Sequence, residues 1–184
     1  MLKRYHIRML SVYKNLILRD IRSYGRRPRF LSCAYAFFEI PGFRAVVYLR
    51  LIEHFWYSKH FFIVNICKYN LLKSCGMDVS PGFKIGHNFK IIHPVGSIIG
   101  KGTTIGNSVI IAGSVIIGQK YTDLKSNEKY PKIGNGVIIG ANVTLIGEIE
   151  IQDNVTIGAN SLVLSSIPAN ITVCGLIKLG KDEI

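Results

Sequence analysis

The chain has 184 residues, of which 48% are hydrophobic and 18% are charged, so its composition excludes a disordered protein and predicts a buried core. The net charge of +12 is uneven: residues 1–75 hold 14 Lys and Arg against 3 Asp and Glu, whereas residues 76–184 hold 9 against 8. The four cysteines form neither a Cys-x-x-Cys pair nor a regular spacing, which argues against a zinc finger and a disulfide framework.

Residues 1–75 are predicted to form a basic α-helical domain of three or four helices. The segments YKNLILRDIRSY and FRAVVYLRLIEHFW carry apolar residues at helical spacings with basic residues between them, and Pro28 and Pro41 separate the helices. No apolar run is long enough for a spanning helix, and the first residues lack the continuous apolar stretch of a signal peptide. We expect a cytoplasmic protein. Its basic domain either contacts the inner face of a membrane or a polyanionic substrate, or is simply a solvated basic surface.

A six-residue period dominates residues 76–184, the second predicted domain. Branched aliphatic residues recur at Ile99, Ile105, Ile111 and Ile117, and again at Ile133, Ile139, Leu145, Ile151, Ile157 and Val163. This period fits neither a helix nor an alternating strand, but it is typical of a parallel β-helix in which each hexapeptide forms one short strand and a turn. The sequence therefore predicts a mainly β domain whose interior is an aliphatic column.

The period is interrupted twice. Counting back from Ile99 by six reaches His93, whereas Ile91 and Ile85 keep a six-residue spacing that is displaced by two positions. The coil around His93 is therefore predicted to be irregular, and His87, six residues earlier, is predicted to stack on His93 from an adjacent coil. The second interruption, QKYTDLKSNEKY at residues 119–130, predicts an extruded loop.

Two segments carry a family resemblance: GMDVSPGFKIGHNFKIIHPVGSIIG, and YPKIGNGVIIGANVTLIGEIEIQDNVTIGANSLVLSSIP. They resemble the hexapeptide-repeat acyltransferases, and within that superfamily the serine acetyltransferases and the related enzymes that acetylate bacterial polysaccharides. The resemblance covers nearly all of residues 76–168. It implies a left-handed β-helix, acetyl-CoA as donor, and a homotrimer with active sites between subunits, either alone or paired into a dimer of trimers.

The resemblance also assigns catalytic roles. The family's catalytic histidine falls on His93, and the aspartate that orients it falls on Asp78, fifteen residues earlier. An imidazole can take the proton of a hydroxyl while the oxygen attacks a thioester carbonyl, and a carboxylate on the other ring nitrogen stabilises the imidazolium. The alternatives are a structural histidine and a turn aspartate before Ser80 and Pro81.

Several positions depart from the serine-specific pattern. Ile92 replaces the aspartate that precedes the catalytic histidine in serine acetyltransferases, Tyr130 replaces their second histidine, and Lys129 replaces an arginine. Arg27 stands where an acidic residue is expected. Because an amino acid acceptor needs an anion near its ammonium, we expect instead a hydroxyl of a surface or capsular polysaccharide or its precursor, with serine as the alternative acceptor. The predicted acceptor-binding residues are Tyr130, Lys129, Ile92 and His87.

For acetyl-CoA, the resemblance implies a groove lined by small residues beside the backbone. The matching positions are Gly118 and Ala141, followed by Gly158 and Ala159, although the corners of the coils explain these small residues equally well. The family's basic ending is altered to CGLIKLGK, which leaves Lys178 and Lys181 as candidates for the CoA phosphates.

Other classes fit less well. A γ-class carbonic anhydrase shares the β-helix but needs three histidine ligands for zinc, and residues 76–184 contain only His87 and His93, so no metal is expected. No nucleic-acid recognition motif accompanies the basic residues, so no nucleic-acid partner is expected. A trimeric scaffold with a degenerate site is the non-enzymatic alternative, against which the retained Asp78 and His93 argue.

Overall fold

The computed structural model describes residues 2–120 and 129–178, with side chains described from Ser11 onward. Four helices come first: α1 (Leu2–Ser23), α2 (Phe30–Glu39), α3 (Pro41–Tyr57) and α4 (Phe61–Cys75). Pro41 is the first residue of α3, where a missing N–H costs nothing, and Pro28 lies in the connection before α2. The predicted N-terminal helical region is confirmed. The division at residue 75 falls between α4 and the first strand, and the assignment of two domains stays a prediction.

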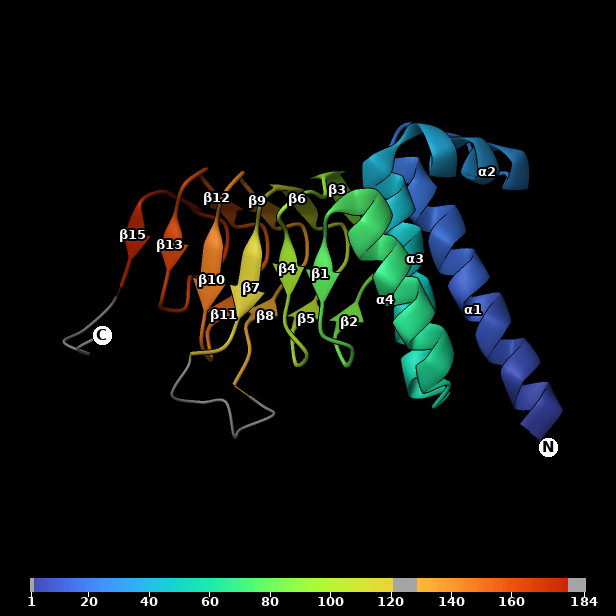
Figure 1. Cartoon of the computed structure of the whole chain (residues 1–184). Helices are drawn as coiled ribbons and strands as arrows, with labels where there is room; N and C mark the ends of the chain where they lie inside the picture. Colours follow the sequence, from blue (N-terminus) through green and yellow to red (C-terminus); the bar gives the residue numbers. More distant parts are fainter. Residues whose placement is uncertain (1, 121–128, 179–184) are drawn as a thin grey trace.

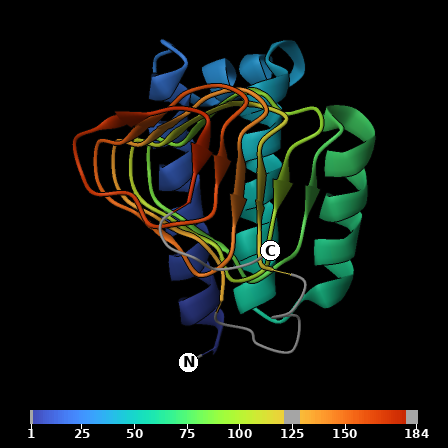
Figure 2. The ribbon, with the colours of Figure 1, turned by 90° about the vertical axis from the view of Figure 1, so that its left-hand side faces the viewer.

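The remaining described chain winds into a parallel β-helix of three sheets (Figure 1). Sheet A contains β1 (Asp78–Val79), β4 (Ile98–Ile99), β7 (Ile116–Gly118), β10 (Thr144–Ile146), β13 (Leu162–Val163) and β15 (Leu176–Ile177). Sheet B contains β2 (Lys84–Ile85), β5 (Thr104–Ile105), β8 (Lys132–Ile133) and β11 (Glu150–Ile151). Sheet C contains β3 (Lys90–His93), β6 (Ile110–Gly113), β9 (Ile138–Ile139), β12 (Thr156–Ile157) and β14 (Thr172–Val173). The chain takes sheets A, B and C in turn, so each coil has three sides (Figure 2).

The aliphatic series predicted from the six-residue period fills the interior of these coils. All ten of its members, from Ile99 to Val163, are at most 4% exposed. They belong to one core that also includes residues of α3 and α4, such as Leu49 and Leu71. Because each hexapeptide supplies one side of a coil, a single repeated apolar position is enough to build a continuous column.

The register of the strands locates both interruptions. Ile98 in β4 pairs with Ile116 in β7, a step of 18, whereas Asp78 in β1 pairs with Ile98, a step of 20. The first coil therefore holds two extra residues, as the displaced series predicts. Ile116 pairs with Thr144, a step of 28, so ten extra residues lie between β7 and β8. The predicted loop at 119–130 falls there, and its residues 121–128 lie outside the described part of the chain.

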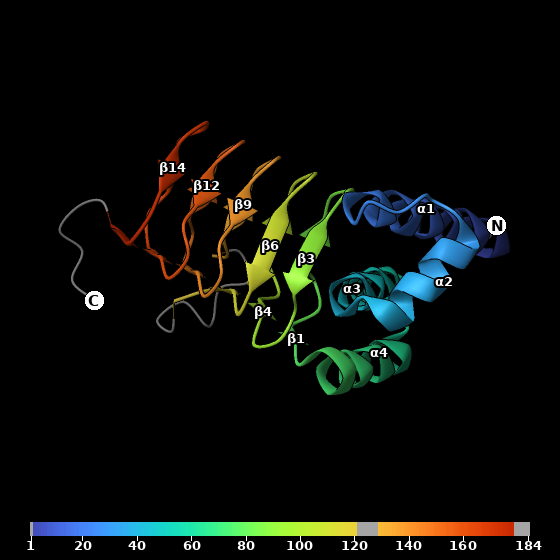
Figure 3. The same ribbon diagram turned by 90° about the horizontal axis from the view of Figure 1, so that it is seen from above.

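The helices cover the N-terminal end of the β-helix, beside its first coil (Figure 3). The first strands β2 and β3 have no neighbouring coil there, and an uncovered strand edge would leave backbone groups without partners. Side chains of α1 and α3, and of Tyr24 directly after α1, take the place of that coil. The Tyr24 hydroxyl, for example, donates to the carbonyl of Ile91 at 2.9 Å and accepts from the N–H of the same residue at 3.0 Å.

A buried ionic cluster, made of Asp20, Arg50 and Glu53, completes this cap. Arg50 is 1% exposed and donates to both oxygens of Asp20, at 2.8 and 3.2 Å, and to Glu53 at 3.4 Å. The same guanidinium donates to the carbonyls of Ile85, at 2.6 Å, and Gly86, while Asp20 accepts from the N–H of Phe89 at 2.9 Å. The cluster thus satisfies the edge groups of the first coil as well as its own charges.

No single helix among the described residues passes a length and hydropathy test for a membrane span. α2 and α3 together pass a length and hydropathy test for a span, but as a pair bent by 114°. Most of α3 is buried in the core, including Phe43, Leu49 and Ile52, so the most exposed apolar side chains of this pair belong to α2.

Candidate functional site

The extra residues of the first coil lie at its turn from sheet C to sheet A, which we call the C–A corner. In β3 the side chain of Ile91 points into the core and is fully buried, whereas Ile92, at 42% exposure, and His93 face outward. Ile91 therefore takes the place in the aliphatic column that the strict period would give to His93. The imidazole is exposed at the corner, as a general base must be to meet a substrate.

Asp78 lies at the same corner, at the start of sheet A. The N–H of Asp78 donates to the carbonyl of Ser97 at 3.1 Å, and the N–H of Gly96 donates to the carbonyl of Gly76 at 2.9 Å. The segment that follows His93 thus runs beside the segment that contains Asp78. In this single chain the Asp78 carboxylate accepts the N–H of Val79 at 2.8 Å, so its predicted bond to His93 stays a prediction. Catalytic hydrogen bonds often tighten only when substrate is bound.

Two glycines make room at this corner, and the sequence analysis identified neither. Gly113 pairs with His93 across β6, and a Cβ there would lie 2.9 Å from the His93 carbonyl and 3.1 Å from its Cβ. Gly42, the second residue of α3, lies so close to β3 that a Cβ would be 1.9 Å from the carbonyl oxygen of Ile91. The N-terminal end of α3 therefore rests directly on the strand that holds Ile92 and His93. In the sequence, the only indication of these close contacts was that a glycine stands within each of the two predicted elements, the helix and the strand.

Tyr130 lies at the turn from sheet A to sheet B, the A–B corner. Its ring packs on Gly100, where an added Cβ would lie 2.5 Å from Cε1 of the tyrosine. Gly100 directly follows β4, whereas His93 precedes it, so one chain holds Tyr130 and His93 at opposite ends of this strand. Lys129 precedes Tyr130 and is half-buried. Tyr130 and His93 therefore lie at different corners of the β-helix.

The residues predicted for acetyl-CoA fall on the same two corners. Ala141, Gly158 and Ala159 lie at the C–A corners of later coils. Backbone hydrogen bonds join these corners from one coil to the next: the N–H of Asn142 donates to the carbonyl of Gly113 at 2.8 Å, and the N–H of Asn160 donates to the carbonyl of Ala141 at 2.9 Å. Ala141 and Ala159 are exposed. Small residues thus recur at the C–A corners of the later coils, on the edge of the β-helix that also holds His93.

The other two candidates lie across sheet A. Gly118 ends β7 at the A–B corner, shortly before the predicted loop, and Lys178 follows β15 at the far end and is exposed. Lys181 lies outside the described residues.

The predicted stacking of His87 on His93 is wrong. His87 lies in the turn between β2 and β3, where its carbonyl accepts from Ser108 at 2.8 Å and its N–H donates to Asn107 at 3.0 Å. Six residues span one side of a coil, whereas the first coil meets its neighbour only 20 residues further along the chain. The two histidines therefore occupy different corners of the same coil.

The surface of sheet A differs from that of sheet B. The outward residues of sheet A form one column, in register: Asp78, Ile98, Ile116, Thr144, Leu162 and Leu176. Asp78 is the one charged member. The corresponding outward residues of sheet B are polar, including Lys84, Lys132 and Glu150. An apolar surface next to a candidate catalytic carboxylate indicates a face that another molecule covers.

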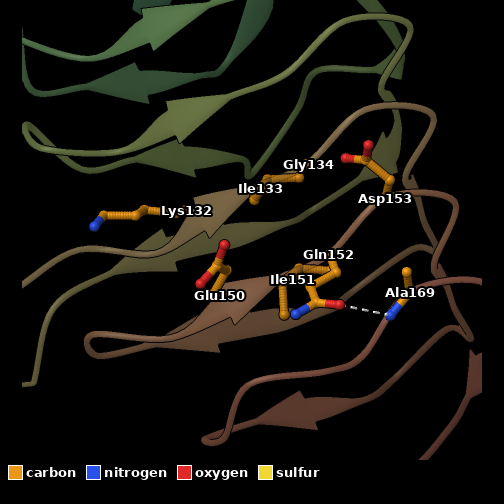
Figure 4. A pocket seen from close by; sticks show the side chains of 8 residues that line it. All are labelled: Lys132, Ile133, Gly134, Glu150, Ile151, Gln152, Asp153 and Ala169. Atoms are coloured by element: carbon orange, nitrogen blue, oxygen red, sulfur yellow. Dashed lines mark hydrogen bonds between the residues drawn. The ribbon is translucent and has the colours of Figure 1, made fainter.

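A hollow of about 370 Å³ on sheet B is separate from the predicted site. Figure 4 shows Lys132 and Glu150 on neighbouring strands of this hollow, and the Gln152 side chain accepts from the N–H of Ala169 at 3.1 Å. None of the predicted catalytic or binding residues lines it. Within residues 2–120 and 129–178 there is also no group of three or more His, Cys, Asp or Glu side chains that could hold a metal ion.

Comparisons with known proteins agree with this architecture. Residues 130–165 match the family model described as bacterial transferase hexapeptide (six repeats). The chain is 34% identical to the serine acetyltransferase of Helicobacter pylori over 135 residues, which are 73% of this chain and 78% of that protein. It is 32% identical to the serine acetyltransferase of Synechococcus elongatus over 137 residues, 74% of this chain and 55% of that protein.

The crystal structure of serine acetyltransferase from Neisseria gonorrhoeae is similar, with a TM-score of 0.80 and 27% identity, covering 90% of this chain and 64% of that one. The predicted fold, a left-handed β-helix preceded by a small helical region, is thereby confirmed. The chain spans about half the length of several curated relatives that it matches, 55% in the Synechococcus protein and 49% in one from Arabidopsis thaliana. The predicted nearness to polysaccharide O-acetyltransferases stays a prediction.

Proposed function

Because the chain belongs to the serine acetyltransferase family of hexapeptide-repeat transferases, we propose that it is an O-acetyltransferase that uses acetyl-CoA as the donor. The observation that carries the proposal is the C–A corner of the first coil. There the two extra residues turn His93 out of the aliphatic column and bring the segment that holds Asp78 beside it.

The chemistry assigned to this corner is a single acyl transfer. The imidazole of His93 takes the proton from the acceptor hydroxyl as its oxygen attacks the thioester carbonyl carbon. The new C–O bond forms, the C–S bond breaks, and the thiolate of CoA takes the proton from the imidazolium. Asp78, on the other ring nitrogen, would hold the tautomer and stabilise the charged imidazole. The products are an O-acetyl ester and free CoA.

The similarity to serine acetyltransferases supports L-serine as the acceptor, ahead of the saccharide expected from the sequence. A saccharide hydroxyl is the second candidate, because Ile92 is exposed beside His93 and offers no anion for an ammonium group. Tyr130, at the A–B corner, carries a hydroxyl that can donate or accept a hydrogen bond.

We expect CoA release from acetyl-CoA to depend on L-serine, and we expect an anion introduced near the serine ammonium to strengthen serine binding. Ile92→Asp should therefore lower the KM for serine about tenfold, whereas the neutral variant Ile92→Asn should not. The measurement is initial CoA release with L-serine and with neutral and acidic saccharides and their nucleotide-linked precursors. Release with a saccharide and none with serine, in both the native chain and Ile92→Asp, would replace serine by a saccharide acceptor.

We also propose that three copies assemble through sheet A, because its apolar column lies next to Asp78 and a single chain keeps Tyr130 away from His93. Helix α4 lies on the same side of the molecule as sheet A (Figures 1 and 2), and its apolar residues Phe62, Ile66, Tyr69 and Leu72 are exposed. Pairing of two trimers and a cytoplasmic location remain predictions.

A matched pair of isoleucines tests this interface. Ile98 on sheet A is 42% exposed and Ile138 on sheet C is 43% exposed, both pointing outward. Ile98→Asp should dissociate the trimer, since it buries a charge in an apolar contact, and Ile138→Asp should not. Light scattering after gel filtration measures the mass. A trimer that survives Ile98→Asp and falls apart with Ile138→Asp would move the interface to sheet C.

A further inference from the structure

The helix α2 presents an apolar surface that no described part of the chain covers. Phe30, Leu31, Tyr35 and Phe38 are 76%, 80%, 62% and 79% exposed. Leu31, Tyr35 and Phe38 follow the spacing i, i+4, i+7, so they lie on one side of the helix. We call these four residues the α2 stripe. The opposite side of α2 is anchored, because Ala36 is fully buried against a cluster with Ile21 and Phe43.

Arginines are concentrated in the segments that flank α2. Residues 19–44 contain six arginines and two acidic residues. Both acids are already paired, Asp20 with the buried Arg50 and Glu39 with Arg26 at 2.7 Å. Among the described residues, Arg19, Arg22, Arg27, Arg29 and Arg44 therefore have no carboxylate partner.

Two of these arginines border a hollow next to α2. Arg19 and Arg22 line a space of about 440 Å³ with Asn15, Leu18 and Pro28, and Pro28 lies two residues before the first residue of α2. A phosphate-sized anion matches two guanidinium groups and an amide, because guanidinium binds phosphate oxygens with charge-assisted hydrogen bonds.

The position of α2 makes the surface accessible. Figures 1 and 3 show α2 at the top of the helical end, away from the stack of coils. Although α2 and α3 together resemble a membrane span by hydropathy, the core buries α3 and so excludes its insertion. What remains is a short helix that can lie in the plane of a membrane surface.

Charge decides between the two simplest occupants of this surface. A second copy of the chain would bring two sets of unpaired arginines together, and like charges brought together repel. An anionic bilayer instead supplies apolar tails for Phe30, Leu31 and Phe38 and phosphates for the arginines, and aromatic residues with flanking arginines are typical of interfacial helices.

We propose that the α2 stripe and the arginines around it dock this protein on an anionic lipid bilayer. Docking also fixes where the His93 corner lies. Arg44 links the end of α2 to the end of α4 through the carbonyls of Phe38, at 3.5 Å, and Ser74, at 3.1 Å. Gly42 rests on β3. A bilayer that holds α2 would therefore hold the C–A corner of the first coil near its surface.

The test is co-sedimentation of the full chain with vesicles of phosphatidylcholine alone and of phosphatidylcholine with 30% phosphatidylglycerol. Binding is expected to the anionic vesicles only and to weaken with salt. Arg27→Gln with Arg29→Gln should weaken it about 25-fold, because each arginine near an anionic surface contributes roughly fivefold. Leu31→Gln with Phe38→Gln should weaken it about tenfold or more.

Matched controls use the same substitutions elsewhere. Lys84→Gln with Lys132→Gln removes two charges from sheet B, and Ile138→Gln removes an apolar side chain that is 43% exposed on sheet C. Both should bind vesicles like the native chain, and unchanged circular dichroism and Tm show that each variant folds. Equal loss in the controls, equal binding to neutral vesicles, or no binding at all overturns the proposal. A second result would also overturn it. If the native chain binds no vesicles and the variant Leu31→Gln with Phe38→Gln forms a smaller assembly, then the α2 stripe is a contact between copies of the chain.

Discussion

Replacing His93 with alanine is expected to lower kcat/KM for acetyl transfer by about 10²- to 10⁴-fold while the Tm stays unchanged. The loss follows from removal of the general base. The fold should survive because the His93 side chain is exposed and makes no hydrogen bond to another described side chain, whereas Ile91 holds the place in the core. Steady-state CoA release and thermal unfolding of the same preparation measure the two quantities.

His87→Ala is the matched control, since His87 is the other histidine of the β-helix and lies in the same coil at a different corner. It should keep most of the activity. If His87→Ala were as inactive as His93→Ala with an intact fold, the site would have to be moved to the turn between β2 and β3. Unfolding of His93→Ala would favour the structural interpretation of this histidine.

Replacing Arg50 with methionine is expected to lower the free energy of unfolding by about 3–5 kcal/mol. The change leaves Asp20, which is fully buried, and Glu53, at 8% exposure, without their cation. It also leaves the carbonyls of Ile85 and Gly86 at the edge of the first coil without their donor, and each such buried group costs about 1–3 kcal/mol. Chemical denaturation monitored by circular dichroism gives the free energy.

The loss in the free energy of unfolding caused by Arg50→Met should depend on pH. Burial raises the pKa of the Asp20 and Glu53 carboxyls, and the Arg50 guanidinium partly offsets this effect. Without Arg50 these pKa values rise further above the unfolded value near 4, so the folded variant binds protons more tightly than its unfolded chain. Protonation then removes the unpaired charges. The difference in stability between the variant and the native chain should shrink as the pH falls from about 8 toward 5.

The exposed pair Arg26 and Glu39 provides the control for this variant. Its two side chains are 42% and 41% exposed and 2.7 Å apart, so Arg26→Met should cost less than about 1 kcal/mol. Asp20→Leu, Arg50→Met and Glu53→Leu together would remove every buried charge of the cluster. If that triple variant were as stable as the native chain, the cluster would be an ordinary ion pair rather than a cap on the strand edges.

The extent to which the site could be predicted differs between residues. His93 and Asp78 were predicted from a break in the period and a family motif, and the structure brings their backbone segments together at one corner. Gly113 and Gly42 could not be predicted, because their importance comes from close approach to β3 by residues that are distant in sequence. The prediction that His87 stacks on His93 was wrong because one hexapeptide forms only one side of a coil. Three hexapeptides are needed before the chain returns to the same side.

The inward-pointing side chains and the irregular coils could both be predicted from the pattern of residues along the chain. Both are local properties: a residue's direction depends on its place in a short strand, and a displaced period or a polar interruption is visible from its neighbours. Tertiary structure alone decided how the β-helix ends and what surrounds His93. Asp20, Arg50 and the edge of β2 come together only when the helices pack on the first coil, since partners for unpaired backbone groups are chosen by proximity in space.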